Sequence, residues 1–376
     1  MSEFTAGPAG RIERVRALMA ERGYDAIVVR DEANLRWLTG VKGVFDYTFE
    51  FPHAAFITAD QCLFHTDSRY LNSFEENTSA GSPWVYDMDE GTIPGWVAGK
   101  IAANKCRVCA VEDDMQINFY QGIQRGLEDR SVACMLPLMH DDIRKMRAIK
   151  DAEEIELMRH AQSITDAAFQ HMLGYIKPGM TEKQVRNELE NFMFANGADS
   201  LAFGSIVASG PNTANPHAVP SDRVIEKGDF VLMDYGAGYC DYRSDMTRTV
   251  VMGEPTSEQL DLYALVRRTH EECVAAIHPG VEGNDIFKLS KKIIGDAGYG
   301  DYYNHGLGHG VGIDIHELPN FNRSKNIIEV GSVITMEPGV YLPGVGGVRL
   351  EDYGVVTENG YEPFTKTPHD LHVIDC

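Results

Sequence analysis

Five residues in the second half of the chain have the side-chain types of a metal site. The set combines four carboxylates with one imidazole, and its members are Asp234, Asp245, His309, Glu337 and Glu351. Carboxylate oxygens together with a single histidine nitrogen suit hard or borderline divalent ions. The number of ligands is enough for two ions, so the sequence predicts a dinuclear metal centre.

The four carboxylates come in two pairs, and each pair is expected on a β-hairpin. Asp234 and Asp245 stand in two strand-like segments on either side of a turn within 236–241. Glu337 and Glu351 repeat this arrangement around a Pro-Gly-Val-Gly-Gly turn. Regular hairpins would place the two members of each pair opposite one another, where like charges are destabilising. A cation between them would remove that repulsion.

Histidines gather in the glycine-rich segment HGLGHGVGIDIHE, which contains His305, His309 and His316. Its glycines exclude a helix and predict a backbone that must approach something closely. We expect one histidine on the metal and another as a donor to substrate, although a surface loop with incidental histidines would also fit. His217, in a Pro/Asn-rich loop, is by itself an ordinary loop residue. Arg349 is expected to orient a ligand or to balance the negative charge.

The elements around these residues show an internal repeat. A helix is expected at 152–173, and capping boxes at 181–184 and 256–259 begin further helices. The tetrapeptides IKPG at 176–179 and IHPG at 277–280 each precede a helix, a glycine and an acidic hairpin. Two such similar halves predict an α+β domain with a pseudo-two-fold axis and the metals at that axis.

The first part of the chain reads differently, with helices and strands in alternation. A helix is expected at 11–22 and a hairpin at 56–66. We therefore expect an α/β domain over residues 1–140, a charged linker over 141–150 and the catalytic domain over 151–376.

Composition excludes several classes of function. The net charge of −22 argues against binding to nucleic acid or to an anionic membrane surface. We expect no membrane span and no signal peptide. Seven scattered cysteines indicate a reducing compartment, and hence a cytoplasmic protein. Cys106 and Cys109 are spaced like a redox or zinc pair, but on the expected strand they would point to opposite faces.

Taken together, these motifs resemble the pita-bread metallopeptidase family, which includes methionine aminopeptidase, aminopeptidase P, prolidase and the metal-free creatinase. In the C-terminal part the resemblance runs through PNTANPHAVPSDR, GDFVLMDYGAGY, HGLGHGVGIDIHE, ITMEPGVYL and GGVRLED. In the N-terminal part, NLRWLTG and HTDSRY resemble the creatinase/prolidase-type domain. The resemblance implies that type of N-terminal domain followed by a pita-bread catalytic domain.

The resemblance also implies a role for each candidate residue. Asp234 would chelate one ion and Asp245 would bridge both. His309 and Glu337 would hold the second ion, and Glu351 would bridge. The remaining candidates match the family's substrate-side histidines and its ligand-orienting arginine, and they are His217, His305, His316 and Arg349.

The implied activity is hydrolysis of Xaa-Pro bonds in short peptides, as in prolidase or Xaa-Pro aminopeptidase. A hydroxide that bridges the two ions would attack the scissile carbonyl. His217 or His316 would donate to the oxyanion, and Glu337 would pass a proton to the leaving nitrogen. Manganese is the metal expected by resemblance, with cobalt, zinc and iron as alternatives, and the family implies a homodimer.

Two other functions stay open. Relatives with similar ligands hydrolyse ectoine or cleave dimethylsulfoniopropionate, and creatinase hydrolyses a guanidine. The aromatic and acidic segment 44–53 departs from the usual prolidase pattern, so it either reaches the active site of a partner subunit or packs on the N-terminal domain. The second alternative is a metal-free binding module, which would lack several of the five ligands.

Overall fold

The computed structural model describes residues 7–42, 52–78, 80–88, 91–321 and 325–376. The chain forms two compact units, Met1–Arg147 and Ala148–Cys376. The boundary falls within the segment expected as a linker, and residues Asp142–Arg147 of that segment form the short helix α6. Of the segment 44–53, residues 44–51 lie outside the described residues. Among the described residues, no helix has the length and apolar character needed to cross a membrane.

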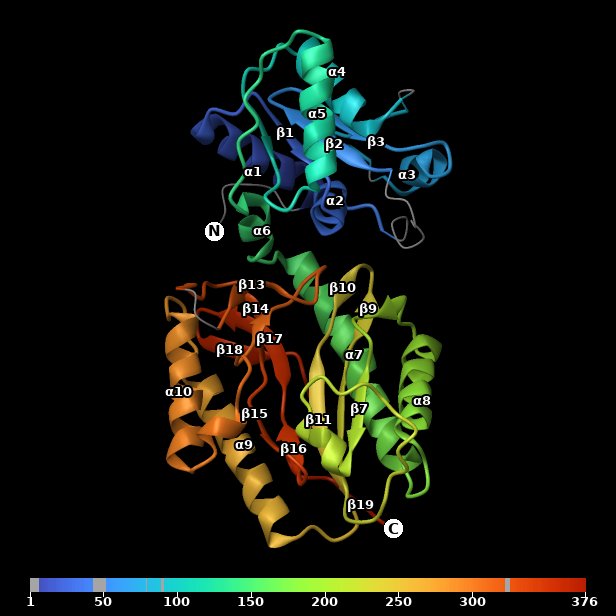
Figure 1. The fold of residues 1–376 in the computed structure, drawn as a ribbon, viewed down its shortest axis with the longest axis vertical. Coiled ribbons are helices and arrows are strands. Elements are labelled where there is room, and N and C mark those ends of the chain that lie inside the picture. The colour runs from blue at the N-terminus through green and yellow to red at the C-terminus, as the bar shows by residue number, and fades with distance from the viewer. Residues whose placement is uncertain (1–6, 43–51, 79, 89–90, 322–324) are drawn as a thin grey trace. The chain divides into compact units, whose positions relative to one another are not determined.

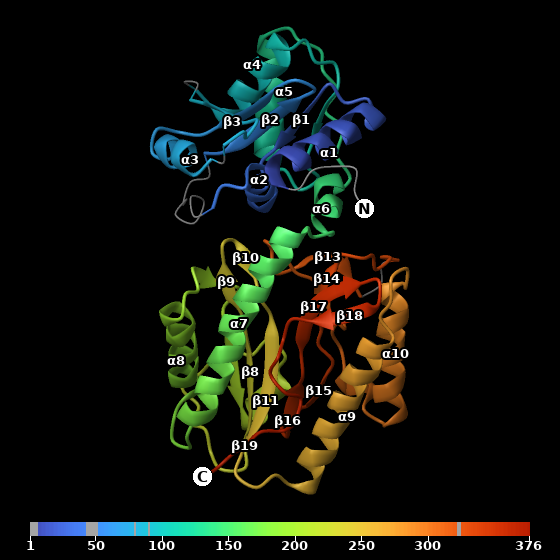
Figure 2. The same ribbon diagram turned by 180° about the vertical axis from the view of Figure 1, so that it is seen from behind.

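The first unit is built on a mixed five-stranded sheet in the order β4-β3-β2-β1-β5. Its strands are β1 (Ala26–Val29), β2 (Ala54–Thr58), β3 (Cys62–His65), β4 (Val85–Asp87) and β5 (Cys109–Val111). The helices are α1 (Gly7–Arg22), α2 (Glu32–Thr39), α3 (Leu71–Asn77), α4 (Ile93–Ala103) and α5 (Ile117–Asp129). Figures 1 and 2 show α4 and α5 on one face of this sheet and α1 on the other.

The apolar sequence of these strands explains why the first unit folds around the sheet. The strand β1, AIVV, is buried along its whole length. Its Ala26 and Val28 pack with Val97 and Ile101 of α4 in one core cluster. Cys106 and Cys109 belong to the same cluster, and both thiols are free.

The second unit contains the internal repeat as two helix pairs and two larger sheets. The pairs are α7 (Ala152–Tyr175) with α8 (Glu182–Ala195), and α9 (Ser257–Ala275) with α10 (Gly283–Asp296). The predicted capping boxes are present at the start of α8 and of α9, where Thr181 and Thr256 accept from the third residue of their helices. Figures 1 and 2 show one helix pair beside each sheet.

The first large sheet has the order β19-β11-β8-β7 and the second the order β13-β12-β14-β17-β18. The strands of the first are β7 (Ile206–Ser209), β8 (Phe230–Tyr235), β11 (Met246–Met252) and β19 (Val373–Ile374). Those of the second are β12 (His309–Gly310), β13 (Glu317–Asn320), β14 (Val333–Met336), β17 (Asp352–Thr357) and β18 (Gly360–Pro363). Smaller pairings involve β6 (Ser200–Leu201), β9 (Ala237–Tyr239), β10 (Tyr242–Arg243), β15 (Gly339–Leu342) and β16 (Gly346–Arg349). Each half thus presents its strands to a separate helix pair, as the repeat predicted.

Candidate metal centre

A cavity of about 500 Å³ in the second unit brings together all five of the predicted ligands. His217 and His316 line the same cavity. The other lining residues are Arg186, Glu190, Phe203, Gly204, Ser205, Ile206, Ala218, Val219, Pro220 and Ile315. Residues from both halves of the internal repeat therefore share one space.

The first carboxylate pair is offset from the expected position. On the β8–β11 ladder Asp234 lies opposite Thr247, not opposite Asp245. The turn that joins the two arms is centred on Cys240 and Asp241, which both have positive φ angles of 47° and 71°. This centre lies one residue later than the midpoint we expected, and one residue at the turn shifts the opposing partner by two. A two-residue shift preserves the strand face, so Asp234 and Asp245 still line the same cavity.

The second carboxylate pair follows the predicted register. Gly339 pairs with Arg349 on β15–β16, and Met336 pairs with Asp352 on β14–β17. The same register on both sides of the pair places Glu337 opposite Glu351. Glu351 is 2% exposed, whereas the side chain of Glu337 retains 20% exposure. The second hairpin therefore holds one enclosed carboxylate and one that is open to the cavity.

His309 lies on β12, and one of its ring nitrogens already makes a hydrogen bond to the backbone. Its Nδ1 lies 3.1 Å from the carbonyl oxygen of Gly310, which keeps a proton on Nδ1 and leaves the lone pair on Nε2. That Nε2 lies 3.6 Å from Asp245 Oδ2 and 3.8 Å from Glu337 Oε1. The ring is thus oriented as a metal ligand would be.

The glycines beside His309 allow this strand to sit tightly in the sheet. A Cβ atom on Gly308 would lie 2.3 Å from the carbonyl oxygen of Thr335, and one on Gly310 would lie 2.2 Å from that of Leu318. Real Cβ atoms do not approach backbone oxygens so closely. The close backbone approach that the sequence predicted is confirmed at these two positions.

Arg349 carries the cationic charge at the base of the cluster. Its Nη2 donates to Asp234 Oδ2 at 2.6 Å, and its Nε donates to Thr247 Oγ1 at 3.0 Å. Thr247 in turn donates to Glu351 Oε2 at 2.7 Å. The arginine therefore contacts Asp234 directly and reaches Glu351 through the threonine hydroxyl. Thr247 was not singled out from the sequence, although it follows Asp245 by two residues and so shares its strand face.

The electrostatics of the cluster favour neutral side chains in the absence of a cation. Burial raises the pKa of Glu337 to about 8, opposed by Arg349 and assisted by Asp234. Burial, followed by the neighbouring carboxylates, raises the pKa of Asp245 and of Glu351 well above the usual range. Burial also lowers the pKa of His309 to about 4. Because a bound divalent cation stabilises carboxylates and neutral imidazole, it would satisfy all of these groups at once.

The three remaining histidines differ in placement. His217 and His316 are exposed side chains on the cavity wall, and the His316 ring lies 4.3 Å from that of His309. His305, expected on the substrate side, does not line the described cavity. Its Nε2 lies 2.9 Å from the hydroxyl of Tyr341, which accepts from Arg349 Nη1 at 2.8 Å. His305 is thus connected to the cluster through Tyr341, a residue that the sequence did not identify.

The residues present fit a pair of divalent ions. Asp245, His309 and Glu351 each offer a ligand atom, and these atoms all lie within 4.8 Å of one another. Asp234 Oδ1 is buried and has no hydrogen-bond partner within the described part of the chain, which is costly unless a cation takes its lone pairs. Glu337 completes the set from the open side. The five candidate residues together offer four carboxylates and one imidazole nitrogen.

The fold and this cluster define a metallopeptidase, and comparison with known families assigns it. Residues 156–358 match the model of metallopeptidase family M24, and residues 11–149 match the creatinase/prolidase N-terminal domain. The chain belongs to metallopeptidase family M24. Membership in this metallopeptidase family implies divalent metal ions, and the predicted class of enzyme and the predicted fold are confirmed.

Individual relatives match nearly the whole chain. An Xaa-Pro dipeptidase from Pyrococcus horikoshii is 42% identical over 96% of this chain and 98% of its own length. A peptidase from Bacillus subtilis, itself uncharacterized, is 36% identical over 97% of this chain and 100% of its own. Among solved structures, an Xaa-Pro dipeptidase from Bacillus anthracis has a TM-score of 0.88 at 36% identity, covering 96% and 99% of the two chains. An X-Pro aminopeptidase from Thermotoga maritima has a TM-score of 0.85 at 30% identity, covering 97% and 100%.

Proposed function

We propose that this protein hydrolyses Xaa-Pro bonds in short peptides with the help of two divalent ions. The observation that carries the proposal is the single cavity that five metal-ligand candidates share with two histidines. Its volume of about 500 Å³ lies in the range of small-molecule sites. The dipeptidase relative at 42% identity supports proline in the second position of the substrate.

The five ligand candidates would divide between the two ions as the family resemblance implies. Asp234 would hold one ion, His309 and Glu337 the other, and Asp245 and Glu351 would lie between them. When bound, two such ions supply a nucleophilic water at neutral pH and polarise a carbonyl group. Arg349 would fix Asp234 through the hydrogen bond at 2.6 Å, which prevents that carboxylate from rotating away.

The cavity histidines and Glu337 would serve the substrate. His217 or His316 would donate an N–H to the oxygen of the scissile carbonyl as negative charge develops there. Glu337, the open member of its pair, would hold the proton that passes to the leaving nitrogen. In an Xaa-Pro bond that nitrogen carries no hydrogen, so the site would recognise proline without an acceptor for an amide N–H.

The test is hydrolysis of a small panel by metal-stripped protein, before and after addition of manganese, cobalt or zinc. The panel holds Ala-Pro, Ala-Pro-Ala, Ala-Ala and creatine. Metal-dependent cleavage of Ala-Pro alone would support a dipeptidase, and cleavage of Ala-Pro-Ala as well would support an aminopeptidase. Cleavage of no proline peptide by protein that has bound two ions would overturn the proposal.

A variant pair connects this activity to the metal cluster. Glu351→Gln should lose bound metal and reduce hydrolysis at least 100-fold while the far-ultraviolet circular dichroism stays unchanged, because a neutral amide is a poor replacement for a carboxylate that would hold the ions. Glu358→Gln, in the turn after β17, is the matched control and should behave as the parent protein. Full activity of Glu351→Gln would contradict the ligand assignment.

We infer manganese as the resident metal and a homodimer as the assembly, both from the family resemblance. Metal analysis of protein purified without added ions tests the first inference. Light scattering coupled to size-exclusion chromatography tests the second, and a monomeric mass would contradict it.

A further inference from the structure

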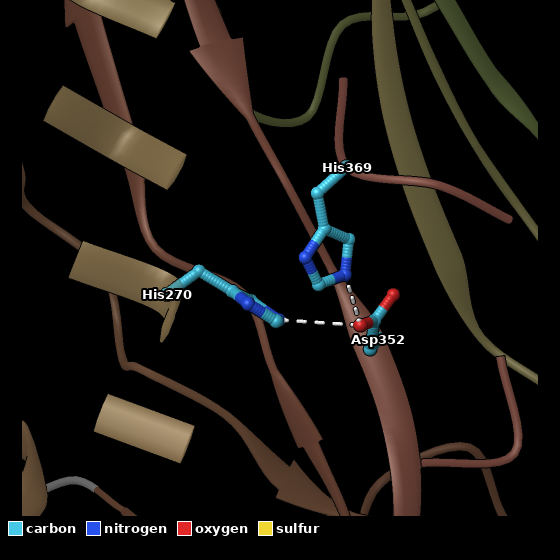
Figure 3. A group of neighbouring side chains, drawn as sticks. All are labelled: His270, Asp352 and His369. Atoms are coloured by element: carbon cyan, nitrogen blue, oxygen red, sulfur yellow. Dashed lines mark hydrogen bonds and ion pairs between the residues drawn. The ribbon is translucent and has the colours of Figure 1, made fainter. Parts of the chain in front are cut away.

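A second cluster of metal-ligating side chains lies in the catalytic unit outside the cavity. Figure 3 shows His270, from α9, and His369, from the segment before β19, converging on Asp352 at the start of β17. Asp352 Oδ2 lies 2.6 Å from His369 Nε2 and 3.6 Å from His270 Nε2. One ligand atom from each residue falls within 4.8 Å of the other two.

Of the three side chains in this cluster, His270 is the one without a hydrogen bond to a described residue. The side chain is 1% exposed, and neither ring nitrogen has a hydrogen-bond partner among the residues that the structure describes. A buried polar group without a partner is destabilising, so its presence needs a reason. Burial also lowers the pKa of His270 to about 4, which keeps the imidazole neutral and able to bind a metal at neutral pH.

We propose that His270, Asp352 and His369 bind a single borderline divalent ion such as zinc, separate from the dinuclear centre. Two imidazoles and one carboxylate are a common protein ligand set for zinc, and solvent can fill the fourth position. Of the three side chains only His369 is partly exposed, at 26%, so the ion would reach the site past that ring.

The surroundings of His369 resemble the outer layer of a metal site. Its Nδ1 lies 4.0 Å from Glu271 Oε1, on the side of the ring away from Asp352. Glu271 is itself held by Arg267, whose Nε donates to it at 2.8 Å. At this distance the carboxylate makes no hydrogen bond to the ring, but its negative charge favours a cation on the opposite nitrogen. His369 thus has one nitrogen toward the shared site and the other toward a carboxylate.

The positive charge of Arg248 would repel a cation at this site, but the hydrogen bonds of its guanidinium reduce that repulsion. Its Nη2 donates to Asp352 Oδ1 at 2.7 Å, which leaves Oδ2 facing the two imidazoles. The other guanidinium hydrogens donate to backbone carbonyl oxygens, those of Thr247, Glu351, Thr367 and Pro368. These oxygens offset part of the arginine charge, and the ion pair holds the carboxylate in one orientation.

The site would lie at the start of β17, on the opposite side of the chain from Glu351. Glu351 and Asp352 are consecutive, and successive side chains on a strand point to opposite faces. Glu351 lines the cavity, whereas Asp352 faces α9 and the C-terminal segment. A metal bound there would tie these three elements together without contacting substrate, so its expected role is structural.

The experiment measures metal stoichiometry in the full-length protein after exchange into zinc. His369→Ala, at the partly exposed position, should bind one equivalent fewer than the parent protein, whatever the occupancy of the dinuclear centre. His278→Ala, an exposed histidine that follows α9, is the control and should bind as the parent does. Equal zinc content in the parent protein and in His369→Ala would overturn the proposal.

A second variant separates ligation from packing. His270→Leu removes the unsatisfied ring but retains apolar volume. If His270 is a ligand, this variant loses the same equivalent of zinc, and zinc no longer raises its melting temperature as far as it does for the parent. If the ring is only a buried side chain, zinc binding is unchanged and the melting temperature stays the same or rises, which would contradict the proposal.

Discussion

At the scale of single residues, Arg349 shows how one side chain can organise several others. It is 2% exposed and hydrogen bonds to Asp234, Thr247 and Tyr341 with three different nitrogens. Only a planar guanidinium provides that many donors in fixed directions. The charge also compensates a cluster that otherwise contains four carboxylates.

We therefore expect Arg349→Lys to weaken metal binding and hydrolysis although the charge is conserved. A lysine can retain one of the three contacts, which leaves Asp234 free to rotate. The loss expected for a residue behind a metal ligand is about 10- to 100-fold in metal affinity. A calorimetric titration of metal-stripped protein with manganese measures this metal affinity. Arg268→Lys, on the exposed side of α9, is the control, and a metal affinity within two-fold of the parent would refute the positioning role.

The residue scale is also where sequence reasoning reached furthest. Each ligand candidate could be named because its type and motif are local properties of the chain. The hydrogen-bond partner of Arg349 could not be predicted in this way, because Asp234 is 115 residues away and lies on a different strand. Sequence spacing placed the arginine near Glu351, whereas the packing of two hairpins against one another decided which carboxylate it contacts. His305 was predicted on the substrate side, but it does not line the described cavity, and its contact with Tyr341 depends on tertiary structure.

At the scale of elements, the first turn of α8 anchors the loop that carries His217. Glu182 is fully buried, and its Oε1 accepts from the backbone N–H and hydroxyl of Ser209 and from Asn212. Its Oε2 accepts from the backbone N–H and hydroxyl of Ser221. One carboxylate thereby fastens both ends of the segment 209–221.

Replacement of this anchor should affect both stability and catalysis. In Glu182→Gln, one oxygen becomes an amide that faces donors, so at least one buried hydrogen bond is lost. We expect a decrease of about 1–3 kcal/mol in the free energy of unfolding and a fall in kcat, because His217 loses its fixed position. Urea denaturation and steady-state kinetics measure the two effects. Glu188→Gln on the same helix, where the half-exposed carboxylate contacts His171, should change neither by a comparable amount.

The element scale also shows where prediction from sequence failed. The capping boxes were predicted correctly because a helix start is encoded within four residues. The register of the first acidic hairpin was predicted incorrectly. Its turn depends on positive φ angles at Cys240 and Asp241, which their residue types do not require. The second hairpin, with glycines at its turn, was placed correctly.

At the scale of the whole molecule, the chain is two units with separate cores. The cluster around β1 and α4 belongs to the first unit, and the clusters around α7–α8 and α9–α10 belong to the second. The candidate ligands lie in the second unit, so metal binding should stabilise that unit. The first unit should respond to a different variable, the pH, through His53.

His53 is a fully buried histidine surrounded by aromatic rings of the first unit. The rings of Phe64, Tyr70 and Phe74 lie 5.1–5.7 Å from it. Burial lowers its pKa from 6.5 to about 4, against the attraction of Asp67 and with smaller repulsion from nearby cations. The groups that repel the charged ring are His65, Arg69 and Arg30. The native state therefore holds the ring neutral at a pH where the unfolded chain would protonate it.

The sign of the effect follows from that difference. Above pH 6.5 neither state binds the proton, so the neutral ring costs nothing. Between pH 6.5 and 4 His53 is protonated in the unfolded chain but stays neutral in the native state, so stability falls as the pH falls. Over this whole pH range, His53 alone lowers the free energy of unfolding by at most about 3 kcal/mol. His53→Phe, which places a fourth aromatic ring in the cluster, should reduce the loss.

The decisive quantity is the change in unfolding free energy of the first unit between pH 7 and pH 5, measured by urea denaturation. A constant change in packing energy in His53→Phe cancels in this difference, so only the proton linkage remains. His140→Gln, whose side chain is 70% exposed in the same unit, is the control and should retain the parent dependence on pH. If His53→Phe lost as much stability on acidification as the parent protein, the prediction would be wrong. The pH dependence of this unit would then come from titratable groups other than His53.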